Sequence, residues 1–146
     1  MGLVKIAIDT NLFINVKEKE EPFFKYSSKI LDSIEDGQLK GVISIITIAE
    51  LCVGYYNIAK PKEKDEYISS IYSQENYKVV NLDRVLADQS AKIRSETSLR
   101  LPDSIIVATS LQENVSFLIS NDGKFDRAKN FIKVCTSEKF CKKYLS

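Results

Sequence analysis

Short apolar runs alternate along this 146-residue chain with longer segments of helical spacing, and this alternation limits the folds open to it more than any other feature. The first run, Leu3–Ile8, has Lys5 as its only polar residue, which is typical of a strand covered on both faces. Strands that alternate with helices indicate βαβ units, which build a parallel sheet with helices on both sides. We therefore predict an α/β fold of three layers, α/β/α, with a central parallel sheet of about five strands.

The alternation is regular enough to assign elements along the whole chain. The predicted strands are Leu3–Ile8, Val42–Ile45, Tyr77–Val80, Phe117–Ser120 and Phe131–Val134. The predicted helices are Pro22–Glu35, Ile46–Ala59, Pro61–Tyr72, Asp83–Glu96, Asp103–Glu113, Asn121–Ala128 and Ser137–Leu145. No repeat, low-complexity tract or linker interrupts them, so residues 1–146 are predicted to form a single domain.

Composition is that of an ordinary globular protein. Apolar residues make up 44% and charged residues 28%, and no apolar run approaches the ~20 residues of a membrane-spanning helix. No signal-peptide pattern follows Met1, and the three cysteines are odd in number and widely spaced, as reduced thiols in a cytosolic protein are. We therefore expect a cytoplasmic protein that does not enter a membrane.

The chain contains no histidine, and this absence restricts its chemistry. It excludes Ser-His-Asp and Cys-His nucleophile systems and every histidine-ligated zinc site. A net charge of +1 provides no overall attraction for nucleic acid, so any such attraction would be local. Hydrolysis by this chain would depend on carboxylates, on lysine or on a metal with oxygen ligands.

Four acidic residues lie at the ends of predicted elements. Asp9 follows the first strand and Asp122 the fourth, while Glu50 and Asp103 lie in the first turn of predicted helices. In open α/β sheets, sites form beyond the carboxyl ends of the strands, so the four can meet at one edge of the sheet. Each acid alone also fits a structural role, as a helix cap, as a charge that suits a helix N-terminus, or as part of a polar stripe around Glu50.

Convergence of the four acids would have a chemical consequence. Carboxylates about 5 Å apart repel by roughly 3 kcal/mol per pair at an effective dielectric constant near 20, so the cluster would require a compensating cation or proton. Ligand sets made only of oxygen favour Mg²⁺ or Mn²⁺. Such an ion can activate a water molecule and neutralise charge that develops on a phosphate. The acids therefore indicate metal-dependent phosphodiester hydrolysis.

The segments around these acids resemble the four motifs of the PIN-domain nuclease family. They are IAIDTNLFI (Ile6–Ile14), ISIITIAELCVG (Ile43–Gly54), LPDSIIVATSL (Leu101–Leu111) and FLISNDGKF (Phe117–Phe125), in the family's order. The resemblance implies a PIN fold and a Mg²⁺- or Mn²⁺-dependent endoribonuclease that cleaves RNA with a metal-activated water. It assigns metal binding to Asp9, Glu50, Asp103 and Asp122.

The same resemblance implies roles for other residues and for partners. Thr10 and Asn11 would shape the site beside Asp9, Ser120 stands where the family more often has Thr, and Asp126 could supply a further acid. In length the chain is similar to the VapC-type toxins of toxin–antitoxin pairs, which implies an antitoxin partner and a homodimer in addition to the RNA substrate. The alternatives are an RNA-processing PIN nuclease outside such a pair and a PIN domain that serves as a non-catalytic binding or scaffold module.

Two other α/β families also place an acid after the first strand, and both fit less well. A haloacid-dehalogenase-like phosphatase requires a second acid two residues after the first, where this chain has Asn11. A response-regulator receiver domain requires a lysine after the fifth strand, where this chain has Cys135 and Thr136.

Two groups of surface residues have more than one interpretation. Basic side chains near the motifs, which are either contacts for the RNA backbone or ordinary solvated charges, are Lys17, Lys19, Lys124, Arg127 and Lys129. The helix predicted over Ile46–Ala59 is apolar on nearly every side. Its excess apolar residues, which either neighbouring helices or a second chain must cover, are Ile48, Leu51, Cys52, Tyr55 and Tyr56.

Overall fold

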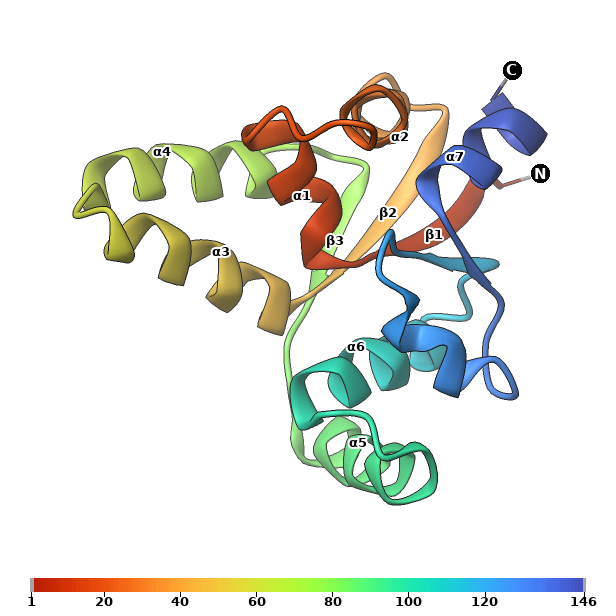
Figure 1. The fold of residues 1–146 in the computed structure, drawn as a ribbon. Coiled ribbons are helices and arrows are strands. Elements are labelled where there is room, and N and C mark those ends of the chain that lie inside the picture. The colour runs from red at the N-terminus through yellow and green to blue at the C-terminus, as the bar shows by residue number, and fades with distance from the viewer. Residues whose placement is uncertain (1, 146) are drawn as a thin grey trace.

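A computed structural model, which describes residues 2–145, contains a five-stranded parallel sheet between two layers of helices (Figure 1). The strands are β1 (Val4–Ile8), β2 (Leu39–Ser44), β3 (Tyr77–Val80), β4 (Phe117–Ile119) and β5 (Val134–Cys135). The α-helices are α1 (Thr10–Lys17), α2 (Phe24–Glu35), α3 (Ile45–Asn57), α4 (Pro61–Tyr72), α5 (Arg84–Thr97), α6 (Leu101–Gln112) and α7 (Ser137–Phe140). A 3₁₀ helix, η1 (Gly123–Ala128), and a π-helical turn, η2 (Cys141–Leu145), complete the described elements. The predicted α/β/α fold is confirmed.

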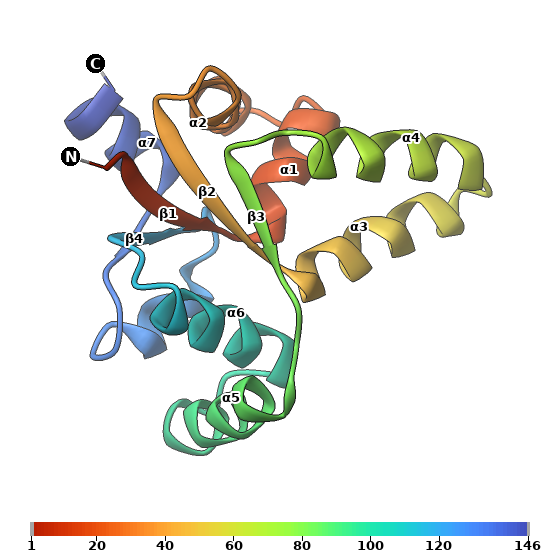
Figure 2. The same ribbon diagram turned by 180° about the vertical axis from the view of Figure 1, so that it is seen from behind.

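Alternate side chains of each strand face opposite helical layers. From β1, Ile6 and Ile8 join a core with α1, α2, α3 and α7, whereas Ala7 joins a second core with α5, α6 and η1. From β4, Ile119 and Leu118 divide between the two cores in the same way. Figure 2 shows these layers on the two sides of the sheet. The nearly continuous apolar runs of the sequence are explained by this burial on both faces.

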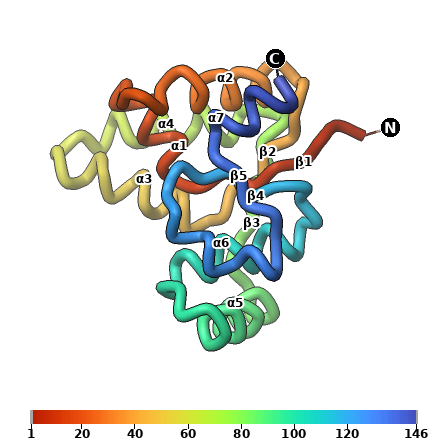
Figure 3. The backbone as a smooth tube through the Cα atoms, turned by 45° about the vertical axis from the view of Figure 1, so that its right-hand side comes forward, coloured from red at the N-terminus to blue at the C-terminus, as the bar shows by residue number. Residues whose placement is uncertain are grey.

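The order of the strands in the sheet is β3-β2-β1-β4-β5, so the chain reverses its direction of progress at β1 (Figure 3). It first adds β2 and β3 on one side of β1, then returns through α5 and α6 to place β4 on the other side. Parallel sheets form their binding sites where the order reverses, beyond the carboxyl ends of the two diverging strands. This point lies between the ends of β1 and β4.

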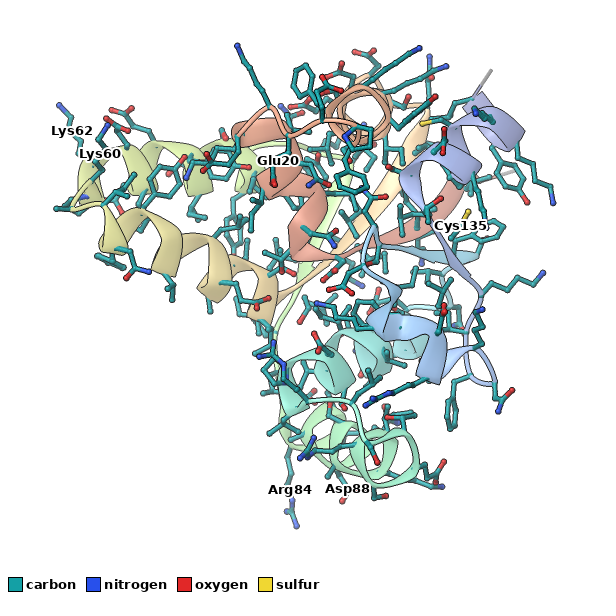
Figure 4. All side chains as sticks on the ribbon, viewed as in Figure 1. Glu20, Lys60, Lys62, Arg84, Asp88 and Cys135 are labelled. Atoms are coloured by element: carbon teal, nitrogen blue, oxygen red, sulfur yellow. The ribbon has the colours of Figure 1, made fainter. Side chains whose placement is uncertain are left out.

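Helices α3 and α4 form an antiparallel pair that projects from the sheet, with Lys60 and Lys62 at its tip (Figures 1 and 4). The pair is held partly by Tyr55 and Tyr67, whose ring centroids are 5.6 Å apart. Much of the apolar excess predicted for α3 is therefore covered within the chain: Ile48, Leu51 and Tyr55 are buried, and Cys52 is half-buried. Tyr56 stays 58% exposed.

The prediction missed one element, α1, and misplaced the start of two strands by three residues each. Helix α1 was not predicted, because its run of Leu12, Phe13, Ile14 and Val16 has no clear helical face over only two turns. Strand β2 begins three residues earlier than predicted, where Lys40 and Gly41 hide the apolar pattern. Strand β5 begins at Val134 and not at Phe131, because the turn that follows η1 extends to Ile132, whose side chain is buried in the second core.

Two further observations concern membrane-spanning helices and the cysteines. No helix within residues 2–145 is both long enough and apolar enough to span a bilayer. All three cysteines are free thiols; Cys141 is buried, and Cys52 and Cys135 are partly exposed.

Gly41 lies where β2 passes closest to its neighbours, and an added methyl group there is expected to destabilise the fold. A Cβ at this position would lie 2.8 Å from Cδ1 of Ile34 and 3.0 Å from Cδ1 of Tyr77. Both side chains pack in or against the first core, so relief of the overlap disturbs that packing. We expect Gly41→Ala to lower the free energy of unfolding by about 1–3 kcal/mol in urea titrations. Gly54→Ala, where a Cβ meets nothing within 4 Å, is the matched control and should be neutral or stabilising.

Candidate active site

Three of the four predicted acids meet at the point where the strand order reverses. Asp9 directly follows β1 and caps α1. Asp122 follows β4 by three residues and caps η1, and Asp103 is the third residue of α6. Asp9 and Asp103 are buried, with 1% and 4% of their surface exposed, whereas the Asp122 side chain is 52% exposed. The three carboxylates therefore line a site that opens on the side of Asp122.

The ammonium group of Lys124 occupies the centre of these acids. Its Nζ lies 3.2 Å from Oδ1 of Asp103, 3.6 Å from Oδ2 of Asp9 and 3.9 Å from Oδ2 of Asp122. Burial acts to lower the pKa of Lys124, but the carboxylates of Asp9 and Asp103 outweigh it and raise that pKa above its usual value. The site thus contains a cation contributed by the chain itself, whereas the sequence indicated for Lys124 either a contact with RNA or an ordinary solvated charge.

Asp9 is held from both sides by hydrogen bonds. The backbone N–H of Thr10 donates to its Oδ1 at 2.9 Å, and the hydroxyl of Ser120 donates to its Oδ2 at 2.9 Å. Burial raises the pKa of Asp9, although Lys124 and these two hydrogen bonds act to lower it. Ser120 also accepts a hydrogen bond from the backbone N–H of Asp122 at 3.1 Å, and it thereby links the ends of β1 and β4.

Glu50 lies beside the three acids and not among them. It is the sixth residue of α3, in the second turn and not in the first turn where the sequence placed it. The hydroxyl of Thr10 donates to Oε1 of Glu50 at 2.7 Å and also lies 2.9 Å from Oγ1 of Thr47, which is fully buried. Thr10 therefore connects the two acids, because its backbone N–H donates to Asp9 and its hydroxyl donates to Glu50.

A buried polar network fixes the loop that carries Asp122, and the sequence analysis did not identify it. The side-chain amide of Asn121 donates to Oδ1 of Asn15 at 2.9 Å and to Oγ of Ser27 at 3.1 Å. Its carbonyl oxygen accepts from the backbone N–H and the hydroxyl of Ser137, at 3.0 and 2.8 Å. Asn11 makes longer contacts, at 3.4 Å to Ser120 and 3.5 Å to the N–H of Asn121. The only local signal for this network was the position of Asn121 between Ser120 and Asp122.

A groove of about 520 Å³ begins at the acids and runs along the starts of α6 and η1. Its lining residues are Ser98, Leu99, Arg100, Asp103, Asp122, Gly123, Lys124, Asp126 and Arg127. Two arginines stand in it: Arg100 lies 3.5 Å from Asp103, and Arg127 donates to the backbone oxygen of Ser98 at 3.1 Å. The sequence analysis missed Arg100, which precedes the third motif.

The other predicted residues lie away from the cluster. Asp126 lines the groove, but its carboxylate pairs with Lys129 at 3.4 Å. Lys17 stacks on the ring of Tyr55, with Nζ 3.6 Å from the centroid, and Lys19 is exposed after the end of α1. Neither of these two lysines lines the groove.

The donor set of the cluster suits a divalent ion of the Mg²⁺ type. It consists of carboxylate oxygens alone, and these already surround one cation, the ammonium of Lys124. Mg²⁺ requires oxygens about 2.0–2.1 Å away, which is much closer than these contacts. Accordingly, within residues 2–145 no three acidic or thiol side chains are grouped tightly enough to hold a metal as they stand. The chemistry of the donor set fits the ion, and the carboxylates would have to come closer together to bind it.

Comparison with solved structures shows close likeness in fold. The VapBC2 complex of Rickettsia felis, bound to a DNA fragment from its promoter, has a chain that matches with a TM-score of 0.71 at 19% identity, over 91% of this chain and 98% of that one. FitAcB of Neisseria gonorrhoeae matches with a TM-score of 0.67 at 23% identity, over 91% and 98%. The sarcin–ricin-loop-cleaving toxin VapC20 of Mycobacterium tuberculosis matches with a TM-score of 0.68 at 13% identity, over 84% and 94%.

Sequence comparison identifies the family directly. No curated protein is similar enough in sequence to count as a match. The family described as PIN domain, however, matches residues 6–130, which include all three acids of the cluster as well as Glu50. This chain belongs to the PIN-domain family.

Proposed function

We propose that this chain is a Mg²⁺- or Mn²⁺-dependent endoribonuclease. The observation that carries the proposal is the convergence of Asp9, Asp103 and Asp122 on a single cation at the reversal point of the sheet. Three carboxylates gathered this closely repel one another unless a cation or a proton compensates; Lys124 contributes one positive charge, and a divalent ion would contribute two. Membership of the PIN family and the likeness in fold to a toxin that cleaves the sarcin–ricin loop support the same activity.

The residues of the chain divide the chemistry between them. Asp9, Asp103 and Asp122 would hold the ion, and Glu50 would act from one step further away, through Thr10. A bound divalent ion supplies the activation of water and the neutralisation of phosphate charge that hydrolysis needs. Ser120 and Thr10 orient Asp9 through hydrogen bonds, and the side-chain amide of Asn11 contacts the hydroxyl of Ser120. Asp126 would act only at the edge of the groove.

Removal of divalent ions is the test of this function. We expect purified protein to cleave single-stranded RNA with Mg²⁺ or Mn²⁺ and to lose all cleavage in EDTA, with activity restored when excess ion is added back. Metal should also raise the melting temperature, because an ion that binds only the folded chain stabilises it. Cleavage that persists in EDTA would contradict the proposal. Absence of both cleavage and any metal-dependent change in melting temperature would leave a non-catalytic binding or scaffold module.

The arginines of the groove are placed to bind the RNA backbone. Arg127 projects into it from η1, and Arg100 stands beside Asp103 at the start of α6. We expect Arg127→Gln to weaken RNA binding about 3–10-fold and to lower the slope of log affinity against log salt by about one, because one phosphate contact is lost. Arg84→Gln is the control, since Arg84 points outward from α5 (Figure 4), and its salt slope should equal that of the wild type. Equal slopes for all three proteins in fluorescence anisotropy titrations would exclude Arg127 from the RNA path.

The biological context that we propose is that of a cytoplasmic toxin in a toxin–antitoxin pair, formed by residues 1–146 as one PIN domain. The solved structures similar in fold include toxin–antitoxin proteins, and these matches cover at least 90% of both chains. Exposed apolar side chains on α3, Val53 and Tyr56, offer a surface for a homodimer partner or an antitoxin. An RNA-processing role outside such a pair is the alternative.

A further inference from the structure

Lys124 contacts the same carboxylate oxygens that a metal ion would use. Its Nζ lies within 3.9 Å of oxygens from Asp9, Asp103 and Asp122. A divalent ion held by the carboxylates of Asp9 and Asp103 would use groups that the ammonium already contacts. An ion close to these oxygens would place a second positive charge beside the ammonium, and this repulsion favours departure of the ammonium from the cluster. The ammonium and the ion would therefore compete for the same carboxylates.

The surroundings of Lys124 allow its side chain to leave without a change in the backbone. Its backbone N–H is fixed separately, by a hydrogen bond of 3.0 Å to Oδ1 of Asp122. Its side chain is 30% exposed and lines the groove, so a rotation of the flexible stem moves the ammonium toward solvent. The ammonium also lies over the ring of Phe125, with Nζ 5.1 Å from the ring centroid. The lysine is held by charge and not by enclosure.

We propose that Lys124 is an internal counter-ion that stabilises the acids in the metal-free protein, and that a divalent ion binds only by displacing it. This inference rests on the proposed metal-dependent function. The free energy of metal binding is then the free energy of the ion's contacts with the three carboxylates, reduced by that of the contacts that the ammonium loses. The lysine keeps the cluster assembled until the ion arrives, and it also raises the concentration of ion that is needed.

Metal affinity measured by isothermal titration calorimetry tests the displacement. We expect Lys124→Met, which keeps the apolar stem but removes the charge, to bind Mg²⁺ and Mn²⁺ at least 10-fold more tightly than wild type. Lys124→Arg keeps the charge and should bind no more tightly than wild type. Lys62→Met, at the exposed tip of the α3–α4 pair (Figure 4), should leave affinity unchanged.

Each outcome of the titration decides between the two proposals. Equal or weaker binding by Lys124→Met, beside a wild type that binds metal and an Asp103→Asn variant that does not, overturns the displacement and leaves the proposed function standing. If Lys124→Met binds metal and the wild type does not, displacement is supported in its strongest form. If no chain binds metal, both proposals are wrong.

A second measurement uses the wild-type protein and so does not depend on how the variant folds. Displacement frees the Lys124 amine from its three carboxylates, and we expect an amine-reactive label to modify it several-fold faster with saturating Mg²⁺ than in EDTA. Peptide mass spectrometry gives the rate, and Lys62 in the same sample serves as the internal reference. Equal or slower labelling of Lys124 in Mg²⁺ would overturn the inference.

Discussion

Asp9→Asn is expected to abolish metal-dependent RNA cleavage, with a loss of at least about 10³-fold, while the fold becomes no less stable. Asparagine has nearly the same shape, and its side-chain oxygen can still accept the hydrogen bond from Thr10 N–H. It removes, however, one of the three charges that would hold the ion. The rate of cleavage of a fluorescent RNA and the melting temperature, both measured on one preparation, are the readouts.

The stability of Asp9→Asn follows from the raised pKa of Asp9. A carboxyl group whose folded-state pKa lies above its unfolded value lowers stability when it ionises, so the cost is absent at low pH and appears as pH rises through the folded-state pKa. Without metal at neutral pH, the variant should therefore melt at or above the wild-type temperature, and the difference should vanish in acid. With Mg²⁺ only the wild type should gain stability. If Asp9→Asn keeps more than a tenth of the wild-type activity, Asp9 is not required for catalysis.

The control for Asp9→Asn is Asp88→Asn, an acid that points outward from α5, far from the cluster (Figure 4). It should cleave RNA at the wild-type rate and respond to metal as the wild type does. The same pair tests the toxin proposal, since induced expression in a bacterial host should arrest growth for the control and not for Asp9→Asn. If Asp88→Asn cleaves RNA in vitro but its expression does not arrest growth, an RNA-processing enzyme is favoured over a toxin.

Asn121→Ala is expected to lower the free energy of unfolding by about 2–4 kcal/mol, because each buried polar group left without a partner costs about 1–3 kcal/mol. The side chain makes four hydrogen bonds, to Asn15, to Ser27 and twice to Ser137. Its removal leaves the buried N–H and hydroxyl of Ser137 without their acceptor and takes one partner each from Asn15 and Ser27, which stay bonded to each other. Urea titrations measure this loss, and Asn130→Ala, at an exposed position, should change stability by less than about 0.5 kcal/mol.

The same variant should also bind metal more weakly under conditions where it is fully folded. Asn121 lies between Ser120, which holds Asp9, and Asp122, so its loss frees the loop that brings both acids together. Calorimetry at a low temperature, where the variant remains folded, separates this effect from global destabilisation. Unchanged metal affinity in a destabilised variant would reduce Asn121 to a purely structural residue.

Much of the architecture could be predicted because many elements have a recognisable residue pattern in the local sequence. Continuous apolar runs indicate strands buried on both faces, and α4 and β3 have the predicted bounds. Asp83 caps α5 as predicted, through its hydrogen bond to the N–H of Leu86. Elements with weak local pattern were misplaced: α1 is two turns long, and β5 pairs through only two residues. Their positions depend on tertiary packing, which spacing along the sequence does not record.

The candidate site shows the same division. Asp9 and Asp122 could be placed at one edge of the sheet because both follow strands, and the structure has them there; their part in catalysis stays a prediction. The place of Lys124 among the acids could not be predicted, because a flexible side chain two residues after Asp122 can point in several directions. The contact between Asn15 and Asn121 joins residues 106 positions apart, and neither residue carries a local signal of the other.

The reversal of strand order has a consequence for how the protein comes into being. Asp9 enters the chain early, but the residues that orient and complete its surroundings, Ser120 and Asp122, enter more than a hundred positions later. Until β4 has been synthesised and inserted beside β1, one flank of Asp9 has no neighbour, and the acids remain scattered over unconnected parts of the chain. On the proposed function, a chain that stops before residue 122 should have no nuclease activity, because it lacks one of the three acids. On the same proposal, activity should appear only after β4 has been synthesised and inserted beside β1.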